Sequence, residues 1–155
     1  MTIRQVVRRT MLLAGILIFF MFEAGCFAQN AADAILGEWY SPDKDGKFLF
    51  YKYNGKYYGK VTWIKEPNDA TGKPITDKAN PDPALRNRPL MGMDVFTHFI
   101  YDPEENQWVD GKVYDSRHGD LYSCNMRLVS NLVLEVHGFV GFSWLGKSAY
   151  FTRNK

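Results

Sequence analysis

Residues 45–65 carry the clearest structural signal in this chain and read DGKFLFYKYNGKYYGKVTWIK. Two runs of aromatic and β-branched residues are Lys47–Tyr53 and Tyr57–Lys65, and the second follows Asn54-Gly55 and Lys56. Asn-Gly and Asp-Gly dipeptides tolerate the positive φ angles of type I′ turns. The segment therefore predicts a tight antiparallel β-hairpin that is entered through Asp45-Gly46.

The same pattern of short strand-like runs and turn residues extends over the rest of the chain. Six further runs show it: Ile35–Tyr40, Val95–Tyr101, Trp108–Asp115, Leu121–Val129, Leu132–Val140 and Lys147–Arg153. Together with the hairpin they make eight short strands, and helical periodicity is scarce. Regular short strands with hairpin signals predict an all-β antiparallel domain, either a sandwich or a barrel.

One predicted strand, Leu121–Val129, shows its two faces clearly. Alternate residues on one side are mostly apolar or aromatic, namely Tyr122, Cys124, Met126 and Leu128. Because successive side chains point to opposite faces of a sheet, this set should face the interior. We therefore interpret Cys124 as a small core residue, since a nucleophilic cysteine needs partial exposure and a neighbouring base.

The one long connection between predicted strands is Glu66–Asp94, which contains five prolines. Loops of this length in a compact domain are functional or disordered, and the leucines, prolines and arginines of its second half favour an ordered lid. Arg86 and Arg88 could clamp a carboxylate or phosphate of a ligand. Alternatively, they could pin the lid to Asp82 or Asp94.

The N-terminus has the three parts of a secretory signal peptide. Residues 1–10 carry three arginines, an apolar run of 12 residues spans Met11–Phe22, and small residues follow. As a helix this run would span about 18 Å, which is short of the roughly 30 Å hydrocarbon core of a bilayer. We therefore predict a signal peptide over residues 1–28, a single domain over residues 29–155, and export to the periplasm.

Two cleavage sites compete in this leader. Cys26-Phe27-Ala28 ahead of Gln29 fits ordinary signal peptidase, and we favour this site. Ala24-Gly25-Cys26 resembles the end of a bacterial lipoprotein box, which would leave the protein lipid-anchored at Cys26. Such boxes carry an aliphatic residue where this chain has Glu23.

Charge and composition exclude several classes of function. Without residues 1–28 the chain has equal numbers of basic and acidic residues, so it lacks the positive footprint of a nucleic-acid-binding protein. No later apolar run could span a membrane, and the single remaining cysteine allows no internal disulfide.

The spacing of His98, His118 and His137 matches no metal motif, and Gly141–Leu145 lacks the second glycine of a nucleophile elbow. We therefore expect no metal, no cofactor and no catalytic residue.

Several segments between Gly37 and Arg153 carry a family likeness. They are Gly37-Glu38-Trp39, Gly59-Lys60-Val61, Asn80–Gly92, Trp108–Asp115, Gly138-Phe139-Val140-Gly141 and Thr152-Arg153. In these segments the chain resembles a family of exported bacterial proteins called domain of unknown function twenty-one forty-seven. The resemblance implies an eight-stranded antiparallel up-and-down barrel of lipocalin or streptavidin type, with one long loop between strands 3 and 4. It implies no activity, cofactor or catalytic residue.

A second likeness concerns how such a barrel closes. Lipocalin-like barrels begin with Gly-x-Trp on the first strand and end with an arginine on the last, and here these residues are Gly37, Trp39 and Arg153. The first and last strands of a closed barrel must pair, because closure removes both sheet edges. We therefore expect Arg153 to lie over the indole of Trp39.

The leading hypothesis for function is an exported binding module for a small amphipathic or apolar ligand, since an eight-stranded barrel can hold one such molecule. The candidate ligand-binding residues are Trp63, Arg86, Arg88, Tyr122 and Met126, with Val61 on the predicted face of Trp63. The alternative is a structural or assembly protein of the cell envelope with a filled barrel, and an enzyme with an unrecognised site is the third hypothesis. An open aromatic cavity would favour the first, a filled interior the second, and converging titratable groups the third.

Overall fold

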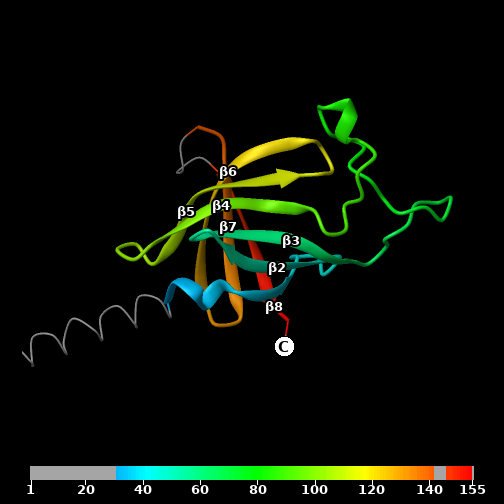
Figure 1. Cartoon of the computed structure of the whole chain (residues 1–155). Helices are drawn as coiled ribbons and strands as arrows, with labels where there is room; N and C mark the ends of the chain where they lie inside the picture. Colours follow the sequence, from blue (N-terminus) through cyan, green and yellow to red (C-terminus); the bar gives the residue numbers. More distant parts are fainter. Residues whose placement is uncertain (1–30, 142–145, 155) are drawn as a thin grey trace, which may run out of the picture.

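Eight antiparallel strands close into a barrel in which each strand pairs with its neighbours in sequence and the last pairs with the first (Figure 1). The computed structural model describes residues 31–141 and 146–154. The strands are β1 (Gly37–Tyr40), β2 (Gly46–Tyr53), β3 (Lys56–Ile64), β4 (Asp94–Asp102), β5 (Gln107–Asp115), β6 (Asp120–Ser130), β7 (Val133–Phe139) and β8 (Gly146–Arg153). The predicted eight-stranded up-and-down barrel is therefore confirmed.

The first strand is shorter than predicted, because Ile35 lies in a short 3₁₀ helix, η1 (Asp33–Ile35). This helix covers one end of the barrel, and Ile35 is fully buried there. Two indoles of the barrel hold it in place: Trp39 Nε1 donates to the carbonyl of Ile35 at 2.8 Å, and Trp108 Nε1 donates to that of Ala32 at 3.1 Å. Buried indole N–H groups need such partners, so η1 both satisfies the indoles and fills this end of the barrel.

The barrel closes between β1 and β8, where Trp39 pairs with Arg153. The guanidinium of Arg153 lies 4.1 Å from the centre of the Trp39 ring. It also donates to three backbone carbonyls, those of Leu36 at 2.9 Å, Ala34 at 2.6 Å and Asn131 at 2.8 Å. Gly37 has a φ of +113°, and a Cβ at this position would lie 3.4 Å from Arg153 Nη1. These contacts join the segment before β1, the end of β8 and the β6–β7 turn around one arginine.

A β-bulge in β3 changes which of its residues face inward. Lys47 pairs with Trp63 whereas the next residue, Phe48, pairs with Val61, so Thr62 is an extra residue in β3. A bulge of this kind disturbs the strict alternation of faces along a strand. Val61 is therefore buried inside the barrel, whereas Trp63 is 37% exposed on the outside.

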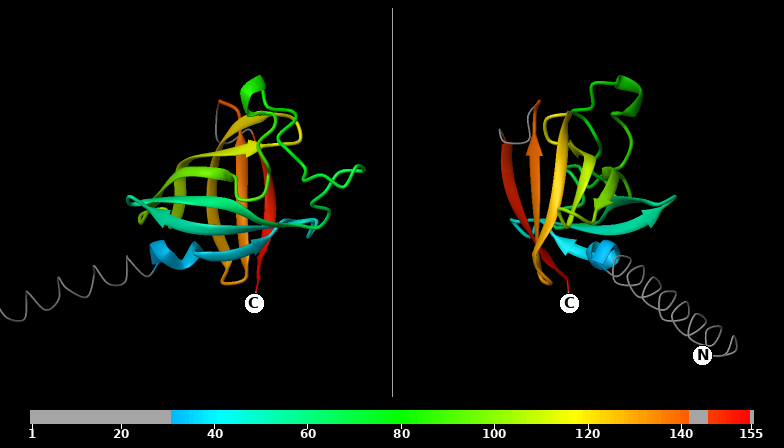
Figure 2. Two further views of the ribbon diagram at one scale, coloured as in Figure 1. Left: turned by 45° about the vertical axis from the view of Figure 1, so that its right-hand side comes forward. Right: turned by 90° about the vertical axis from the view of Figure 1, so that its left-hand side faces the viewer.

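The turns after β1, β3 and β5 gather at the end of the barrel that lies opposite η1 (Figures 1 and 2). The longest of these connections links β3 to β4 and contains a second 3₁₀ helix, η2 (Pro83–Leu85). This long loop therefore stands over the end of the barrel that η1 leaves open.

Residues 1–28, for which a signal peptide is predicted, lie outside the described residues. Within residues 31–141 and 146–154, no helix has the length and apolar character needed to cross a bilayer.

Candidate ligand-binding cavity

A cavity of about 830 Å³ opens at the end of the barrel that faces the long loop. Side chains from five strands form its walls: Phe48, Val61, Ile64, Val95, Phe96, Val113, Ala149 and Phe151. All of these side chains are apolar. The interior of the barrel is therefore open at one end and offers an apolar surface.

Three phenylalanines form the inner part of this cavity. The ring centres of Phe48, Phe96 and Phe151 lie 5.5–5.8 Å apart in edge-to-face arrangements. The ring centre of Phe50 lies 5.0 Å from that of Phe96, on the side toward η1, and Phe50 is almost fully buried. The barrel is therefore filled from this level toward η1. Edge-to-face pairs stabilise an aromatic cluster beyond the burial of its area, so the cavity ends on a fixed aromatic surface.

The long loop contributes two more apolar side chains to the cavity, Ile75 and Leu90. Their backbones are joined, since the N–H of Leu90 donates to the carbonyl of Ile75 at 3.2 Å. The loop is also tied to β3, because the N–H of Gly92 donates to the carbonyl of Val61 at 2.8 Å. The loop is thus a folded part of the cavity wall.

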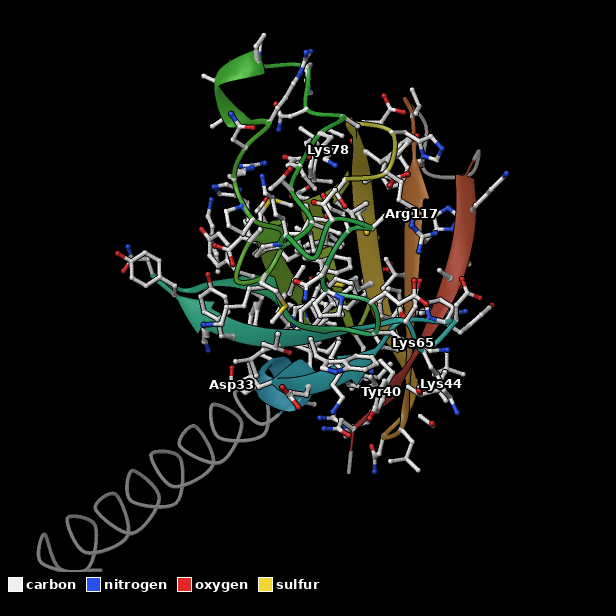
Figure 3. The ribbon with its side chains drawn as sticks, turned by 90° about the vertical axis from the view of Figure 1, so that its right-hand side faces the viewer. Asp33, Tyr40, Lys44, Lys65, Lys78 and Arg117 are labelled. Atoms are coloured by element: carbon white, nitrogen blue, oxygen red, sulfur yellow. The ribbon has the colours of Figure 1, made fainter. Side chains whose placement is uncertain are left out.

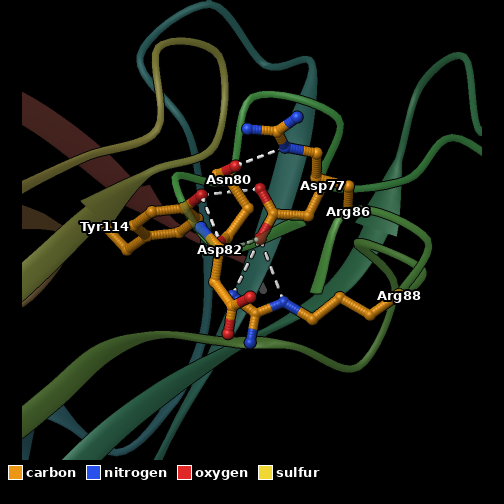
Figure 4. Close-up of polar contacts among 6 residues, drawn as sticks. All are labelled: Asp77, Asn80, Asp82, Arg86, Arg88 and Tyr114. Carbon is orange, nitrogen blue, oxygen red and sulfur yellow. Dashed lines mark hydrogen bonds and ion pairs between the residues drawn. The ribbon is translucent and has the colours of Figure 1, made fainter. Parts of the chain in front are cut away.

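A buried carboxylate holds the loop in this position (Figure 4). Asp77 is fully buried and accepts from the Tyr114 hydroxyl at 2.7 Å and from Asn80 Nδ2 at 2.7 Å. Arg88 donates to the same carboxylate from Nε at 3.0 Å and from Nη2 at 2.8 Å. Burial raises the pKa of Asp77, but the hydrogen bonds from Tyr114, Asn80 and Arg88 outweigh burial and leave that pKa below its usual value.

The two loop arginines pin the loop, but to partners other than those predicted. Arg88 pairs with Asp77, and Arg86 Nε donates to the backbone carbonyl of Asn80 at 2.7 Å. The predicted partners have other roles: Asp82 accepts from the N–H of Ala84 at the start of η2, and Asp94 accepts from the hydroxyl of Tyr51. Neither arginine lines the cavity.

The turn between β5 and β6 docks against the loop through Gly119. This residue has a φ of +80°, and any Cβ on it would collide with the carbonyl oxygen of Ala79. Close approach of two backbones is a common reason for glycine. Glycine at this position therefore allows the turn to touch the loop segment that carries Asp77.

The mouth of the cavity carries its charged groups. Asp45 in the β1–β2 turn and Arg117 in the β5–β6 turn form an ion pair of 2.7 Å. Because these two turns are half a circuit apart in an eight-stranded barrel, the pair bridges the mouth. The hydrogen bond from Ser41 and the charge of Arg117 hold the pKa of Asp45 below its usual value. Figure 3 views the barrel from this end, with Arg117 and Lys65 labelled.

A family model described as "Uncharacterized protein conserved in bacteria (DUF2147)" matches residues 37–153, which include all eight strands of the barrel. The chain belongs to this bacterial family. The DUF2147 barrel is similar in structure to protein HP1028 of the human pathogen Helicobacter pylori, which is described as belonging to the lipocalin family. The two share 26% identity and a TM-score of 0.61, over 71% of this chain and 73% of that one. The architecture is therefore lipocalin-like.

A curated protein, anthranilate synthase component 2 of Haemophilus influenzae, is 37% identical over 81 residues. The match covers 52% of this chain and 38% of that relative. The DUF2147 chain thus spans well under half the length of the relative, and the likeness concerns a part of that protein.

The DUF2147 barrel places the candidate ligand-binding residues apart from one another. Trp63 lies outside, where its ring centre is 6.4 Å from that of Tyr40; this corrects its predicted place in the cavity, and the bulge at Thr62 is the cause. Met126 is buried opposite Trp108, in the filled half of the barrel. Tyr122 is half-buried, and its hydroxyl donates to Asp120 at 3.2 Å. None of the three lines the cavity.

The residues that do line the DUF2147 cavity were mostly missed from the sequence, and strand alternation could have found some of them. Phe48 and Val113 each follow a lysine in a predicted strand, and Phe151 precedes a threonine. Ile75 and Leu90 carry no such signal, because loop residues have no periodic pattern.

The three histidines do not converge in the part of the chain that the structure describes. His98 packs its ring against Tyr58, His118 pairs with Asp115, and His137 contacts Ser148. Residues 31–141 and 146–154 contain no group of three or more His, Cys, Asp or Glu side chains that could hold a metal ion.

Proposed function

We propose that this DUF2147 protein is an exported binding protein that holds a small apolar or amphipathic molecule in its barrel. The observation that carries the proposal is the cavity of about 830 Å³ with apolar walls. Ligand pockets in proteins range over roughly 300–1,000 Å³, with mostly apolar linings and a few placed polar groups. The lipocalin-like fold supports the same function, because eight-stranded barrels of this kind can hold one small ligand.

The distribution of polar groups supports an amphipathic or wholly apolar ligand. The inner wall around Phe48, Phe96 and Phe151 has no charged side chain. The mouth carries Asp45, Lys65 and Arg117. A polar group placed deep in the cavity would lose its hydrogen bonds to water without replacement, which costs about 2–7 kcal/mol. The inserted part of a ligand is therefore apolar, and any polar part remains at the mouth.

Uptake of an uncharged apolar dye tests this function. N-phenyl-1-naphthylamine fluoresces strongly in apolar surroundings, and we expect saturable enhancement with one dye bound per protein. Ala149→Trp should abolish the enhancement, because residue 149 lines the cavity and an indole would fill it. Tyr150→Trp is the matched control, since Tyr150 lies next in β8 and is 52% exposed.

Two results would count against the function. Enhancement that never saturates indicates binding to exposed apolar surface. Equal enhancement in the Ala149→Trp and Tyr150→Trp variants places the dye outside the cavity. In either case the alternative of a structural protein of the cell envelope would lead.

Export is the second part of the proposal, and the leader pattern of residues 1–28 supports it. N-terminal sequencing of the protein recovered from the periplasm should begin at Gln29. A diacylglyceryl-modified Cys26 would reject this cleavage site and retain export, whereas an intact Met1 would reject export.

A further inference from the structure

Asp45 is held in position at the mouth before any ligand arrives. Ser41 is almost buried, and its hydroxyl donates to Asp45 Oδ1 at 2.6 Å. The same hydroxyl accepts from the backbone N–H groups of Asp45 and Gly46, both at 3.0 Å. The β1–β2 turn therefore fixes this carboxylate, and its other oxygen, Oδ2, remains for a further donor.

Arg117 supplies that donor, but it is loosely held. Its Nη2 lies 2.7 Å from Asp45 Oδ2, and its side chain is 70% exposed, against 41% for Asp45. Among the described residues its guanidinium forms this one ion pair. Because an exposed ion pair contributes little to stability, Arg117 can leave Asp45 at small cost while Ser41 keeps the carboxylate in place.

The charges around the mouth favour a cation at this position. The described residues that line it include more carboxylates than cations: Asp43, Asp45, Glu66 and Asp115 against Lys65 and Arg117. When Arg117 turns away into solvent, the carboxylates dominate the potential that a ligand head group meets. A low-dielectric cavity wall beside them strengthens this potential relative to open water.

We propose that the cavity selects apolar molecules that carry a cationic head group, such as a long-chain ammonium, and that Asp45 binds this head in place of Arg117. The proposal rests on the proposed function, since the cavity must first take the apolar tail. Arg117 marks where the ligand cation lies and competes with it. A ligand carboxylate would instead have to draw Arg117 away from Asp45 and remain beside the other carboxylates.

Three compounds with one tail and different heads test the proposal. Decylammonium, decanoate and 1-decanol are compared by their displacement of N-phenyl-1-naphthylamine at low ionic strength. We expect decylammonium to bind about three- to tenfold more tightly than decanoate, with the preference decreasing in 0.5 M salt as the charges are screened.

Two variants locate the effect at the ion pair. Asp45→Asn should bring the affinities for decylammonium and decanoate to within about twofold. Glu104→Gln should leave the preference intact, because Glu104 lies in the β4–β5 turn at the opposite end of the barrel. Arg117→Gln should increase the affinity for decylammonium several-fold and leave that for 1-decanol unchanged. Lys44→Gln is its matched control, because it removes an equal charge from the turn of Asp45 without freeing the carboxylate.

The outcomes separate this inference from the function on which it rests. Failure of the dye to bind the wild-type protein would overturn both. Dye binding with decanoate displacing as well as or better than decylammonium would overturn the cation preference alone. So would a weaker affinity of Arg117→Gln for decylammonium, because Arg117 would then assist the ligand instead of competing with it.

Discussion

Tyr114 connects the cavity to the long loop: its ring lines the cavity, and its hydroxyl donates to the fully buried Asp77 of the loop at 2.7 Å. Arg88 and Asn80 bind the same carboxylate from within the loop. One strand of the barrel and both halves of the loop therefore contact the same buried carboxylate. This arrangement explains how a proline-rich segment can form a defined part of a cavity wall.

Replacing Asp77 should release the loop. We expect Asp77→Asn to lower the free energy of unfolding by about 2–3 kcal/mol at pH 7, because the buried hydrogen-bond network loses the carboxylate that pairs with Arg88. Hydrogen exchange at the N–H groups of Asp77 and Asn80, which bond within the loop, should accelerate. Tyr114→Phe, which removes one donor, should cost less than Asp77→Asn. Unchanged exchange in the loop would contradict this role of Asp77.

The same network predicts a dependence on pH. Because the pKa of Asp77 is lowered in the folded protein, its contribution to stability is fully present above its unfolded pKa of about 4 and is lost as pH falls toward the folded pKa. The difference in unfolding free energy between the wild type and Asp77→Asn should therefore be constant from pH 7 to 5 and decrease below pH 4. Denaturant unfolding at a series of pH values measures it. A difference that grows on acidification would have the wrong sign.

The contact of Gly119 with the loop makes a second prediction. Gly119→Ala should cost about 2–4 kcal/mol, because it combines a strained positive φ with a collision against the Ala79 carbonyl. Gly72→Ala is the control: Gly72 also has a φ of +80°, but nothing lies within 4 Å of its Cβ position. It should cost only the left-handed strain of about 1–2 kcal/mol. Equal losses in thermal unfolding would show that the turn does not depend on this contact.

Barrel closure can be tested by a double-mutant cycle on Trp39 and Arg153. Trp39→Ala should cost about 3–5 kcal/mol as a large core truncation. Arg153→Ala should cost about 2–3 kcal/mol, since three hydrogen bonds to carbonyls are lost together with the contact on the ring. The coupling should be about 0.5–2 kcal/mol. Arg153→Lys should rescue little, because lysine lacks the planar fork; additive single effects would exclude the contact.

Cys124 should resist thiol reagents in the native state. The side chain is fully buried, and burial raises the pKa of its thiol to about 12, so almost no thiolate forms at pH 8. We expect labelling only at denaturant concentrations that unfold the barrel, at a rate set by global opening. Fast labelling without denaturant would place this residue outside the core.

Much of the fold could be predicted because local signals agreed with it. Asn54-Gly55 forms the expected turn with φ angles of +48° and +74°, and the alternation of β6 places Cys124 inside. The contact of Trp39 with Arg153 could be expected from the resemblance to lipocalin-like barrels, which carry Gly-x-Trp on the first strand and an arginine on the last. Closure of the barrel then brings these two strands together.

The cavity was harder to predict, for physical reasons that particular residues illustrate. The bulge at Thr62 moves Trp63 to the outside of the barrel. No residue type in an alternating run indicates where a bulge will form. The sequence does not distinguish Asp77 from the other acidic residues of the loop, because its burial depends on a contact with Tyr114 from a distant strand. Whether the aromatic residues fill the barrel or leave space depends on side-chain packing, which periodicity does not describe.

Methyl NMR during titration with 1-decanol tests whether the barrel binds a small apolar or amphipathic molecule in its open end. We expect saturable shifts, complete at one equivalent of 1-decanol, for Val61, Val113 and Ile75, which line the cavity. Ile100 and Val129, which are exposed on the outside, should not shift. Shifts that are absent from the cavity methyls, or that spread without saturation over Ile100 and Val129, would contradict binding in the open end.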